Sequence, residues 1–412
     1  MAESGYTIIG LVGTSTAEGL VQVRRRTVTR LLILLALCLA FAGPAAAQMM
    51  IVGNDEKATW DEEGKLVISA AGKDTVCIVD LKNPLAPRIV ASLPLTNSVF
   101  GPPVNLAITP DERLAIVANS IDVVQDDKGG LKNQPADQLY VIDLKADPPK
   151  VIDTMHLGKQ PSGLSINPKG DLALVANRED KSISVLSISG TEVKLIDTVP
   201  MGDSVAHVAF TPDGKRALAA KFPMHKIAVL EVEGHKVTYN KLDLWAGMWP
   251  YNVQVVPGGQ IALTADNGNS GSSDGSVDTV SVIDMTGPQP RVIDKVVVGD
   301  GPEGLAVSPT GKVAVAAILN GSNAAKTAFF YHRNGFVAVL KIDGKKVSKV
   351  GEVEVRGLPE GAVFSPDGKW LYVGNFLDGD VSILKVAGSK ITDTGKRLKL
   401  PGHPASMRGR AF

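Results

Sequence analysis

A short turn sequence recurs along this chain, and it constrains the fold more than any other feature. Six copies begin with a proline, at positions 110, 168, 212, 257, 309 and 366, and five of them have glycine two residues later. Proline fixes φ at the start of a turn, and glycine accepts the positive φ that a tight hairpin needs. The copies follow one another at 44 to 58 residues. Such a period is typical of the blades of a β-propeller.

The same set of strands surrounds each copy of the turn. In one unit, an apolar strand is expected at 104–109, a second at 114–119, a third at 139–143 and a more polar fourth at 151–155. Continuous apolar segments suit strands covered on both faces, and alternating segments suit an outer edge. No stretch after residue 48 has helical periodicity. The pattern therefore predicts an all-β chain of four-stranded antiparallel blades.

The first and last parts of the repeat region predict the number of blades and how the ring closes. A weaker copy of the turn at 62–65 raises the count to seven. This copy lacks a preceding inner strand, and the segment 402–407 resembles the start of one. We therefore predict a single seven-bladed β-propeller over residues 48–412, closed by its C-terminal strand, which removes an exposed edge. The segment 49–53 is assigned to an outer strand elsewhere.

The N-terminal segment predicts export. Arg24, Arg25, Arg26 and Arg30 precede an apolar run at 31–42, and three alanines follow at 45–47. This order is typical of a secretory signal peptide, here 24–47, with an uncleaved anchor as the alternative. Residues 1–23 fit neither signal nor fold, and we interpret them as an upstream extension from a start codon assigned too early. We expect a periplasmic or secreted protein with no transmembrane segment after cleavage.

Composition and motifs exclude several classes of function. The formal net charge is +0, so no basic field favours nucleic acid or anionic lipid as a partner. Cys77 is the only cysteine after the signal and lies in an apolar segment, so we expect a buried thiol and no internal disulfide. The sequence has no C-x-x-C-H or H-E-x-x-H motif. It therefore predicts neither a cofactor nor a metal site.

Short phrases in the second and third strands carry a family resemblance. The segments 117–119, 175–177 and 372–376, and the following segments 280–284 and 380–384, resemble the YVTN repeat of bacterial β-propellers. The resemblance covers about residues 50–412. It implies a relation to YncE-like periplasmic proteins and to lactonase-like propellers, and the fold is shared with the heavy chain of methylamine dehydrogenase. A shared fold does not choose among these functions.

The candidate site lies where the loops of a propeller surround the central channel. Loops that enter the inner strands and loops that leave the second strands open on one face, which commonly binds ligands. The residues expected to form a ligand-binding ring there are Asn105, Asn177, Lys221, Trp249, Tyr251, Asn252, Asp266, Arg333, Asn375 and His403. Capping of local turns is the alternative role for the asparagines. Three long insertions, at 120–137, 266–278 and 319–334, are expected to rise on the same face.

Three residues are the candidates for catalysis. Glu303 and Glu360 occur in the same Pro-Glu-Gly phrase of adjacent blades, so their carboxylates are expected at one channel mouth. Like charges at one site raise the pKa of one group or attract a cation. His207 lies near the start of an inner strand, where an imidazole can act as a general base. Solvated rim charges and a structural histidine are the alternatives.

The sequence leaves three functions open. The first is a binding or scaffold propeller for a small molecule, protein or peptide, which the lack of a compact catalytic motif favours. The second is a lactonase-like hydrolase in which His207, Glu303, Glu360 and Arg333 polarise a carbonyl and activate water. The third is a subunit of a periplasmic oxidoreductase that docks a redox partner. Clustering of His207 with both glutamates would favour the hydrolase.

Overall fold

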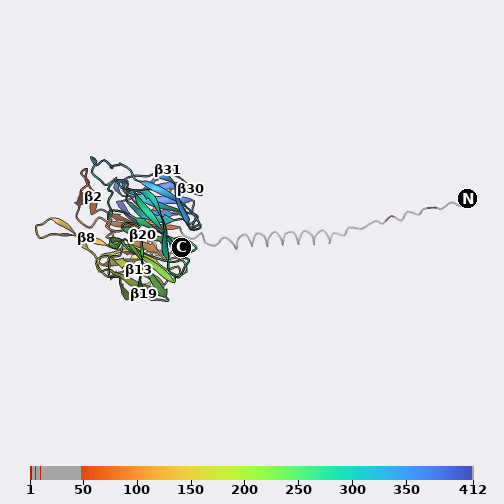
Figure 1. Cartoon of the computed structure of the whole chain (residues 1–412), viewed down its shortest axis with the longest axis horizontal. Helices are drawn as coiled ribbons and strands as arrows, with labels where there is room; N and C mark the ends of the chain where they lie inside the picture. The colour runs from red at the N-terminus through yellow and green to blue at the C-terminus, as the bar shows by residue number, and fades with distance from the viewer. Residues whose placement is uncertain (2–4, 6–9, 11–47, 411–412) are drawn as a thin grey trace. The chain divides into compact units, whose positions relative to one another are not determined.

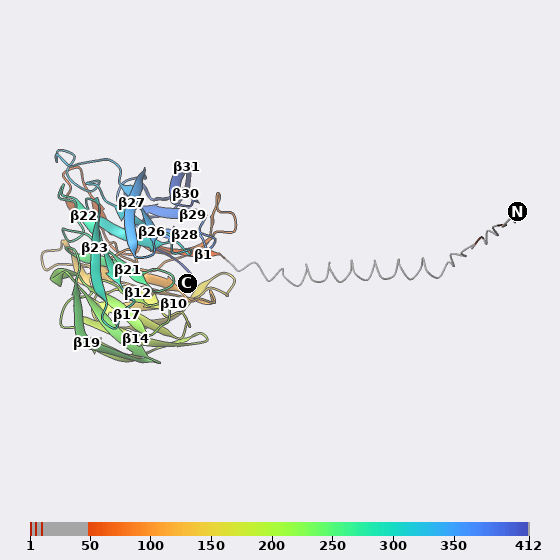
Figure 2. The ribbon, with the colours of Figure 1, turned by 45° about the vertical axis from the view of Figure 1, so that its right-hand side comes forward.

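The computed structural model describes residues 48–410, together with the isolated residues 1, 5 and 10. The predicted signal peptide and, apart from these three residues, the predicted upstream extension lie outside the described residues. Over 48–410 the chain forms seven four-stranded antiparallel sheets, two additional hairpins and two short 3-10 helices. Figure 2 shows the outer strands β19, β23, β27 and β31 following one another along the perimeter. The predicted seven-bladed, all-β propeller is confirmed.

Each blade is described by its strands from the channel outward. Blade 1 contains β32 (His403–Gly409), β1 (Met49–Asp55), β4 (Thr75–Asp80) and β5 (Arg88–Leu93). Blade 2 contains β6 (Leu106–Ile108), β7 (Leu114–Ala118), β10 (Gln138–Asp143) and β11 (Lys150–His156). Blade 3 contains β12 (Pro161–Ile166), β13 (Leu172–Asn177), β14 (Ser182–Ser189) and β15 (Glu192–Pro200). Blade 4 contains β16 (Val208–Phe210), β17 (Arg216–Lys221), β18 (Lys226–Glu233) and β19 (Lys236–Trp245).

The remaining elements complete the ring and its loop face. Blade 5 contains β20 (Pro250–Val255), β21 (Ile261–Asp266), β22 (Asp278–Asp284) and β23 (Arg291–Gly299). Blade 6 contains β24 (Pro302–Val307), β25 (Val313–Ile318), β26 (Phe336–Asp343) and β27 (Lys346–Glu354). Blade 7 contains β28 (Pro359–Phe364), β29 (Trp370–Asn375), β30 (Asp380–Ala387) and β31 (Lys390–Lys399). The hairpins are β2 (Ala58–Trp60) with β3 (Leu66–Ile68) and β8 (Ile121–Gln125) with β9 (Leu131–Pro135), and the 3-10 helices are η1 (Phe222–Met224) and η2 (Phe376–Asp378).

The C-terminal strand closes the ring, as predicted. β32 pairs antiparallel with β1, with Met407 opposite Val52, and β1 in turn pairs with β4. Two details of the prediction are wrong. The segment 49–53 belongs to the second strand of blade 1, where it is buried between two neighbours, and is not an outer strand. The turn at 62–65 joins β2 to β3 in an insertion, because blade 1 takes its inner and second strands from opposite ends of the propeller.

Apolar side chains between neighbouring blades form the core. Between blades 7 and 1, Val52, Cys77, Tyr372 and Met407 pack in one buried cluster, and the Cys77 thiol is buried as predicted. Outer strands alternate instead, as in β5, where every second residue is exposed. Sheets that bury both faces against neighbours are stable only as part of a closed or capped array. The ring therefore depends on the pairing of β32 with β1.

The insertions gather on one face of the ring. The β2–β3 and β8–β9 hairpins follow second strands and project on the same side of the ring in Figure 1. The insertions also bond to one another: the Lys326 N–H donates to the Glu62 carbonyl at 3.0 Å, and the Gly321 N–H donates to Ser273 Oγ at 2.8 Å. Within residues 48–410, no helix has the length and apolar character needed to cross a bilayer.

Candidate functional site

The strand register divides the predicted ring of site residues into two levels of the channel. Leu106 pairs with Val117, Leu164 with Val175, and the other inner strands follow the same register. The level nearer the insertion face, the mouth ring, consists of Val104, Ser162, Ala206, Tyr251, Glu303, Glu360 and Ala405. The next level, the second ring, consists of Asn105, Gly163, His207, Asn252, Gly304, Gly361 and Ser406. His207 and Glu303 were expected at one level and lie on different ones.

Glu303 and Glu360 form a buried pair in the mouth ring. They come from the adjacent inner strands β24 and β28, and their carboxyl groups are close enough for each to influence the pKa of the other. Burial raises the pKa of Glu303 to about 7. Burial and the neighbouring Glu303 raise the pKa of Glu360 well above its ordinary value. Two such carboxyls share a proton at neutral pH, so one of them is a hydrogen-bond donor and the other a base.

Arg178 supplies the positive charge of the mouth. It follows Asn177 at the end of β13, and its Nη1 donates to the Tyr251 hydroxyl at 3.3 Å and to the Phe100 carbonyl at 3.4 Å. Its guanidinium carbon lies 4.7 Å from the centroid of the Phe222 ring. Its charge partly offsets the effect of burial on the pKa of Glu303. Burial raises the pKa of Tyr251 to about 12, so this hydroxyl keeps its proton.

Several buried polar atoms around the mouth have no hydrogen-bond partner among residues 48–410. They are Ser120 Oγ, Ser162 Oγ, Arg178 Nε and Glu360 Oε2. Three of these residues surround Gly101, because a Cβ there would lie 2.7 Å from Ser162 Oγ, 3.7 Å from Arg178 Nη1 and 3.9 Å from Ser120 Oγ. A buried polar group without a partner costs about 1–3 kcal/mol. Each of these groups therefore needs a partner that the described residues do not supply, such as water or a polar ligand.

A buried ion cluster holds the segment that covers the mouth. The Lys57 ammonium pairs with Asp55 at 3.3 Å, contacts Asp74 and donates to the Asn97 carbonyl. Asp55 also accepts the Val99 N–H at 2.8 Å. These bonds fix residues 97–100, whose Phe100 carbonyl reaches Arg178. The sequence analysis missed this cluster because its members are separated by up to 44 residues.

His207 is fully buried in the second ring. Its Nδ1 accepts the Val253 N–H at 3.2 Å, which places the imidazole proton on Nε2. Burial and the nearby Arg408 lower the pKa of His207 well below its ordinary value, so the ring is neutral at pH 7. Within the described residues it forms no hydrogen bond with Glu303 or Glu360. The three predicted catalytic residues therefore do not form one hydrogen-bonded cluster.

The polar residues at the ends of the second strands link strands within a blade. Asn177 Nδ2 donates to Ser182 and Ser184 Oγ, at 3.0 and 2.9 Å, and Asn375 makes the corresponding bond to Ser382. The bonds join side chains of the second and third strands rather than capping a local turn. Asp266 likewise accepts hydrogen bonds from three hydroxyl groups, and burial raises its pKa to about 6.

Lys221 and the second-ring asparagines are also held by neighbouring groups. Lys221 Nζ pairs with Asp203 at 2.7 Å and with Asp243 at 3.1 Å. Asn105 Nδ2 donates to the Ala118 carbonyl at 2.7 Å, and Asn252 Nδ2 donates to the Glu303 carbonyl at 3.3 Å. Asn252 thus supports the backbone that carries Glu303.

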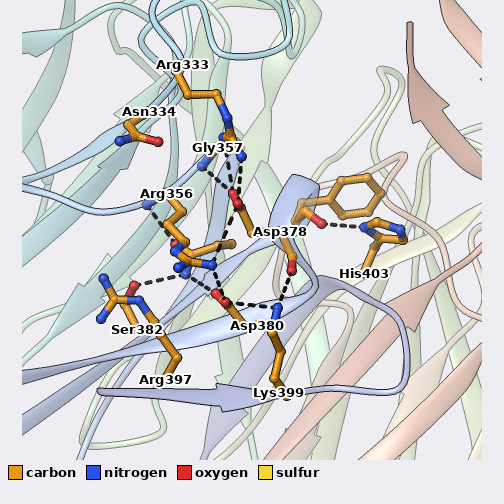
Figure 3. A network of polar contacts seen from close by, with 12 residues as sticks. Arg333, Asn334, Arg356, Gly357, Asp378, Asp380, Ser382, Arg397, Lys399 and His403 are labelled. Atoms are coloured by element: carbon orange, nitrogen blue, oxygen red, sulfur yellow. Dashed lines mark hydrogen bonds and ion pairs between the residues drawn. The ribbon is translucent and has the colours of Figure 1, made fainter. Parts of the chain in front are cut away.

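The other predicted ligand-binding residues lie outside the mouth ring. Figure 3 shows Arg333 directed at Asp378, with Nη2 to Oδ1 at 2.6 Å, in a network that continues to Arg356 and Asp380. His403 Nδ1 lies 2.5 Å from the Phe376 carbonyl oxygen at one side of this network. Trp249 packs against Phe222, with ring centroids 5.3 Å apart. Arg178, and not Arg333, is therefore the cation associated with the glutamate pair.

A sequence signal for Arg178 and Ser120 exists in the repeat. Each comes directly after the asparagine that ends a YVTN-like segment: Arg178 follows Asn177, and Ser120 follows Asn119. Side chains alternate along a strand, so when the asparagine bonds within its blade the next residue is directed elsewhere. Aligning the residue after the asparagine in each repeat would have found both.

Comparison with solved structures finds the same β-propeller fold in several bacterial proteins. A candidate 6-phosphogluconolactonase from Bacteroides fragilis aligns with a TM-score of 0.64 and 18% identity, covering 90% of this chain and 99% of that one. The periplasmic gluconolactonase of Pseudomonas aeruginosa aligns with a TM-score of 0.64 and 16% identity, covering 88% and 99%. A protein of unknown function from Desulfotomaculum acetoxidans aligns with a TM-score of 0.64 and 14% identity, covering 88% and 99%.

At these sequence identities, the alignments show only that the fold is shared. No family model matches the chain, so the YVTN resemblance rests on the residues that suggested it. No curated protein matches it by sequence either. One aligned structure is named for lactone hydrolysis in the periplasm and another has no known function, which agrees with the rule that a propeller fold does not define an activity.

Proposed function

We propose that the chain binds a small, uncharged, oxygen-rich molecule at the channel mouth, between the Glu303–Glu360 pair and Arg178. The observation that carries this proposal is the group of unpartnered buried polar atoms on Ser120, Ser162, Arg178 and Glu360, within the described part of the chain. The raised pKa values of both glutamates keep the negative charge of the pair well below two at pH 7, and Arg178 carries one positive charge. A neutral ligand with hydroxyl or carbonyl oxygens satisfies these groups without adding a buried charge.

Hydrolysis of a lactone at the same place is the second candidate. Glu303, with a pKa of about 7, can take a proton from water and return it, which is the property required of a general acid–base group. As water attacks the carbonyl carbon, Glu303 accepts its proton, and the developing oxyanion receives hydrogen bonds from Arg178 and Tyr251. The ring C–O bond then breaks, and the leaving oxygen takes a proton from the glutamate pair. The product is a hydroxy acid.

The test uses the full chain and a panel of aldonolactones, with binding followed by calorimetry and hydrolysis by base uptake. Arg178→Gln is expected to weaken binding at least tenfold, because a charge-assisted hydrogen bond contributes about 1.5–3 kcal/mol. Arg333→Gln is the matched control and is expected to leave binding unchanged, since Arg333 pairs with Asp378.

Glu303→Gln separates the two candidates. If the protein only binds, this variant retains affinity within a few-fold. If the protein hydrolyses lactones, the variant loses turnover while it still binds. Equal effects of Arg178→Gln and Arg333→Gln would contradict both candidates.

We also propose that residues 24–47 direct export and that the mature protein begins at Gln48. The Arg-rich start and the alanines at 45–47 support this proposal, and β1 begins directly afterwards, at Met49. When the full chain is expressed with its own leader, mass spectrometry of the periplasmic fraction is expected to find Gln48 as the first residue. An intact N-terminus on a membrane-bound protein would instead support the anchor.

A further inference from the structure

A cavity of about 250 Å³ lies at the other end of the channel from the mouth. Its walls come from the inner strands, two levels below the second ring. This level, the inner ring, consists of Ala107, Ser165, Ala209, Gln254, Ala306, Val363 and Arg408. The following level adds Phe210, Val255 and Phe364, so most of the wall is apolar. Among the described residues, Arg408 is the only charged one that lines the cavity.

Arg408 has no acidic or hydrogen-bonding partner among residues 48–410. Arg333, Arg356 and Arg397, in contrast, each pair with an aspartate. Most of the Arg408 side chain is covered, and the surrounding protein lowers its pKa to about 10, so it stays charged at pH 7. A partly covered charge without a partner in an apolar wall is stabilised when an anion binds beside it. The position therefore calls for an anion.

A second buried donor lies near Arg408, although it does not line the cavity. The His207 imidazole carries its proton on Nε2, because Nδ1 accepts the Val253 N–H at 3.2 Å. This Nε2 group has no acceptor in the part of the chain that the structure describes. Arg408 is near enough to lower the pKa of His207.

We propose that this cavity binds a small monocarboxylate, with its carboxylate on Arg408 and its hydrocarbon part against Phe210, Val255 and Phe364. A planar guanidinium matches a carboxylate with two parallel hydrogen bonds. The single cation favours a monoanion over a doubly charged phosphate, and the apolar wall favours a hydrocarbon tail. The cavity is smaller than the usual range for drug-sized ligands, so the ligand is short. The site shares no residue with the mouth and is independent of the function proposed above.

The experiment measures binding of hexanoate to the full chain by calorimetry and by the change in Tm. Hexanoate is expected to bind once per chain and to raise Tm, whereas 1-hexanol and inorganic phosphate are not. Arg408→Gln is expected to reduce hexanoate affinity at least tenfold. Arg410→Gln removes the same charge two residues away, outside the cavity lining, and is expected to leave affinity unchanged. Glu303→Gln, at the mouth, is also expected to leave it unchanged.

Two further measurements keep the proposal testable if Arg408→Gln folds poorly. Without ligand, Arg408→Gln is expected to keep or raise Tm, because it removes an uncompensated charge; a clear fall in Tm would show that Arg408 is paired within the protein and would overturn the proposal. Ala306→Leu fills the cavity but keeps Arg408, and it is expected to abolish hexanoate binding. Phosphate binding tighter than hexanoate, or equal hexanoate affinity in wild type and Arg408→Gln, would also overturn it.

Discussion

The free energy of unfolding is expected to fall by about 3 kcal/mol from the Glu303 carboxyl alone as the pH rises from about 5 to about 8. The pKa of Glu303 is raised from 4.5 to about 7 in the folded protein, so the folded state holds its proton more tightly than the unfolded chain. A raised pKa contributes stability that is complete below the unfolded value and is lost as the pH rises through the folded value. Urea denaturation at several pH values measures this loss.

Glu303→Gln is expected to remove much of this dependence, because the amide cannot lose a proton. Asp266 and Asp278, with pKa values of about 6 and about 7, act in the same direction in the same window. The difference between wild type and variant is therefore the quantity to compare. The exposed Glu179→Gln is the control and is expected to follow the wild-type curve. Parallel curves for wild type and Glu303→Gln would show that the glutamates do not share a proton.

Gly304→Ala is expected to destabilise the propeller by about 3 kcal/mol or more. Gly304 is in the second ring, and an added Cβ would overlap the carbonyl oxygen of Glu360 on the neighbouring inner strand. The atom in the way belongs to the backbone of Glu360, so the clash can be relieved only if the two blades move apart. Such a shift would also separate Glu303 from Glu360. The midpoint of urea denaturation measures the loss of stability.

Gly351→Ala is the matched control for this substitution. Gly351 lies in the outer strand β27, and an added Cβ there has no neighbouring atom within 4 Å. Its denaturation midpoint is expected to remain near the wild-type value, because the strand can accept alanine without rearrangement. If Gly304→Ala were as mild as Gly351→Ala, the inner strands would be farther apart than the structure places them.

Arg178 and Arg408 lie at opposite ends of the channel and have chemically different surroundings. Arg178 has aromatic neighbours and a tyrosine hydroxyl at 3.3 Å, and it faces a negatively charged pair. Arg408 has an apolar wall and no anion within the described residues. A neutral polar ligand fits the first place and an anion with a hydrocarbon tail fits the second. Their variants are expected to act independently because the two sites share no residue.

The sequence by itself determined the blades, their strands and the closing strand. Turns and strands depend on residues near one another in the chain, such as the proline and glycine of each turn and the apolar run after it, so a repeat of 44 to 58 residues reveals them. The repeated Pro-Glu-Gly phrase also placed Glu303 and Glu360 at one mouth. The turn at 62–65 was misassigned to a blade for the same reason. A tight turn needs glycine in an inserted hairpin as much as in a blade, so the local sequence does not distinguish the two.

Only the tertiary structure decided which charged groups meet. Arg178 and Glu303 are 125 positions apart, and Arg408 approaches His207 across 201 positions, since 303 − 178 = 125 and 408 − 207 = 201. Such approaches depend on how seven blades pack around one channel and on a one-residue offset between levels. That offset placed His207 below the glutamates, and the fold of the insertion that carries Arg333 directed this residue to Asp378. Contacts across a ring are set by packing between blades, which no local pattern encodes.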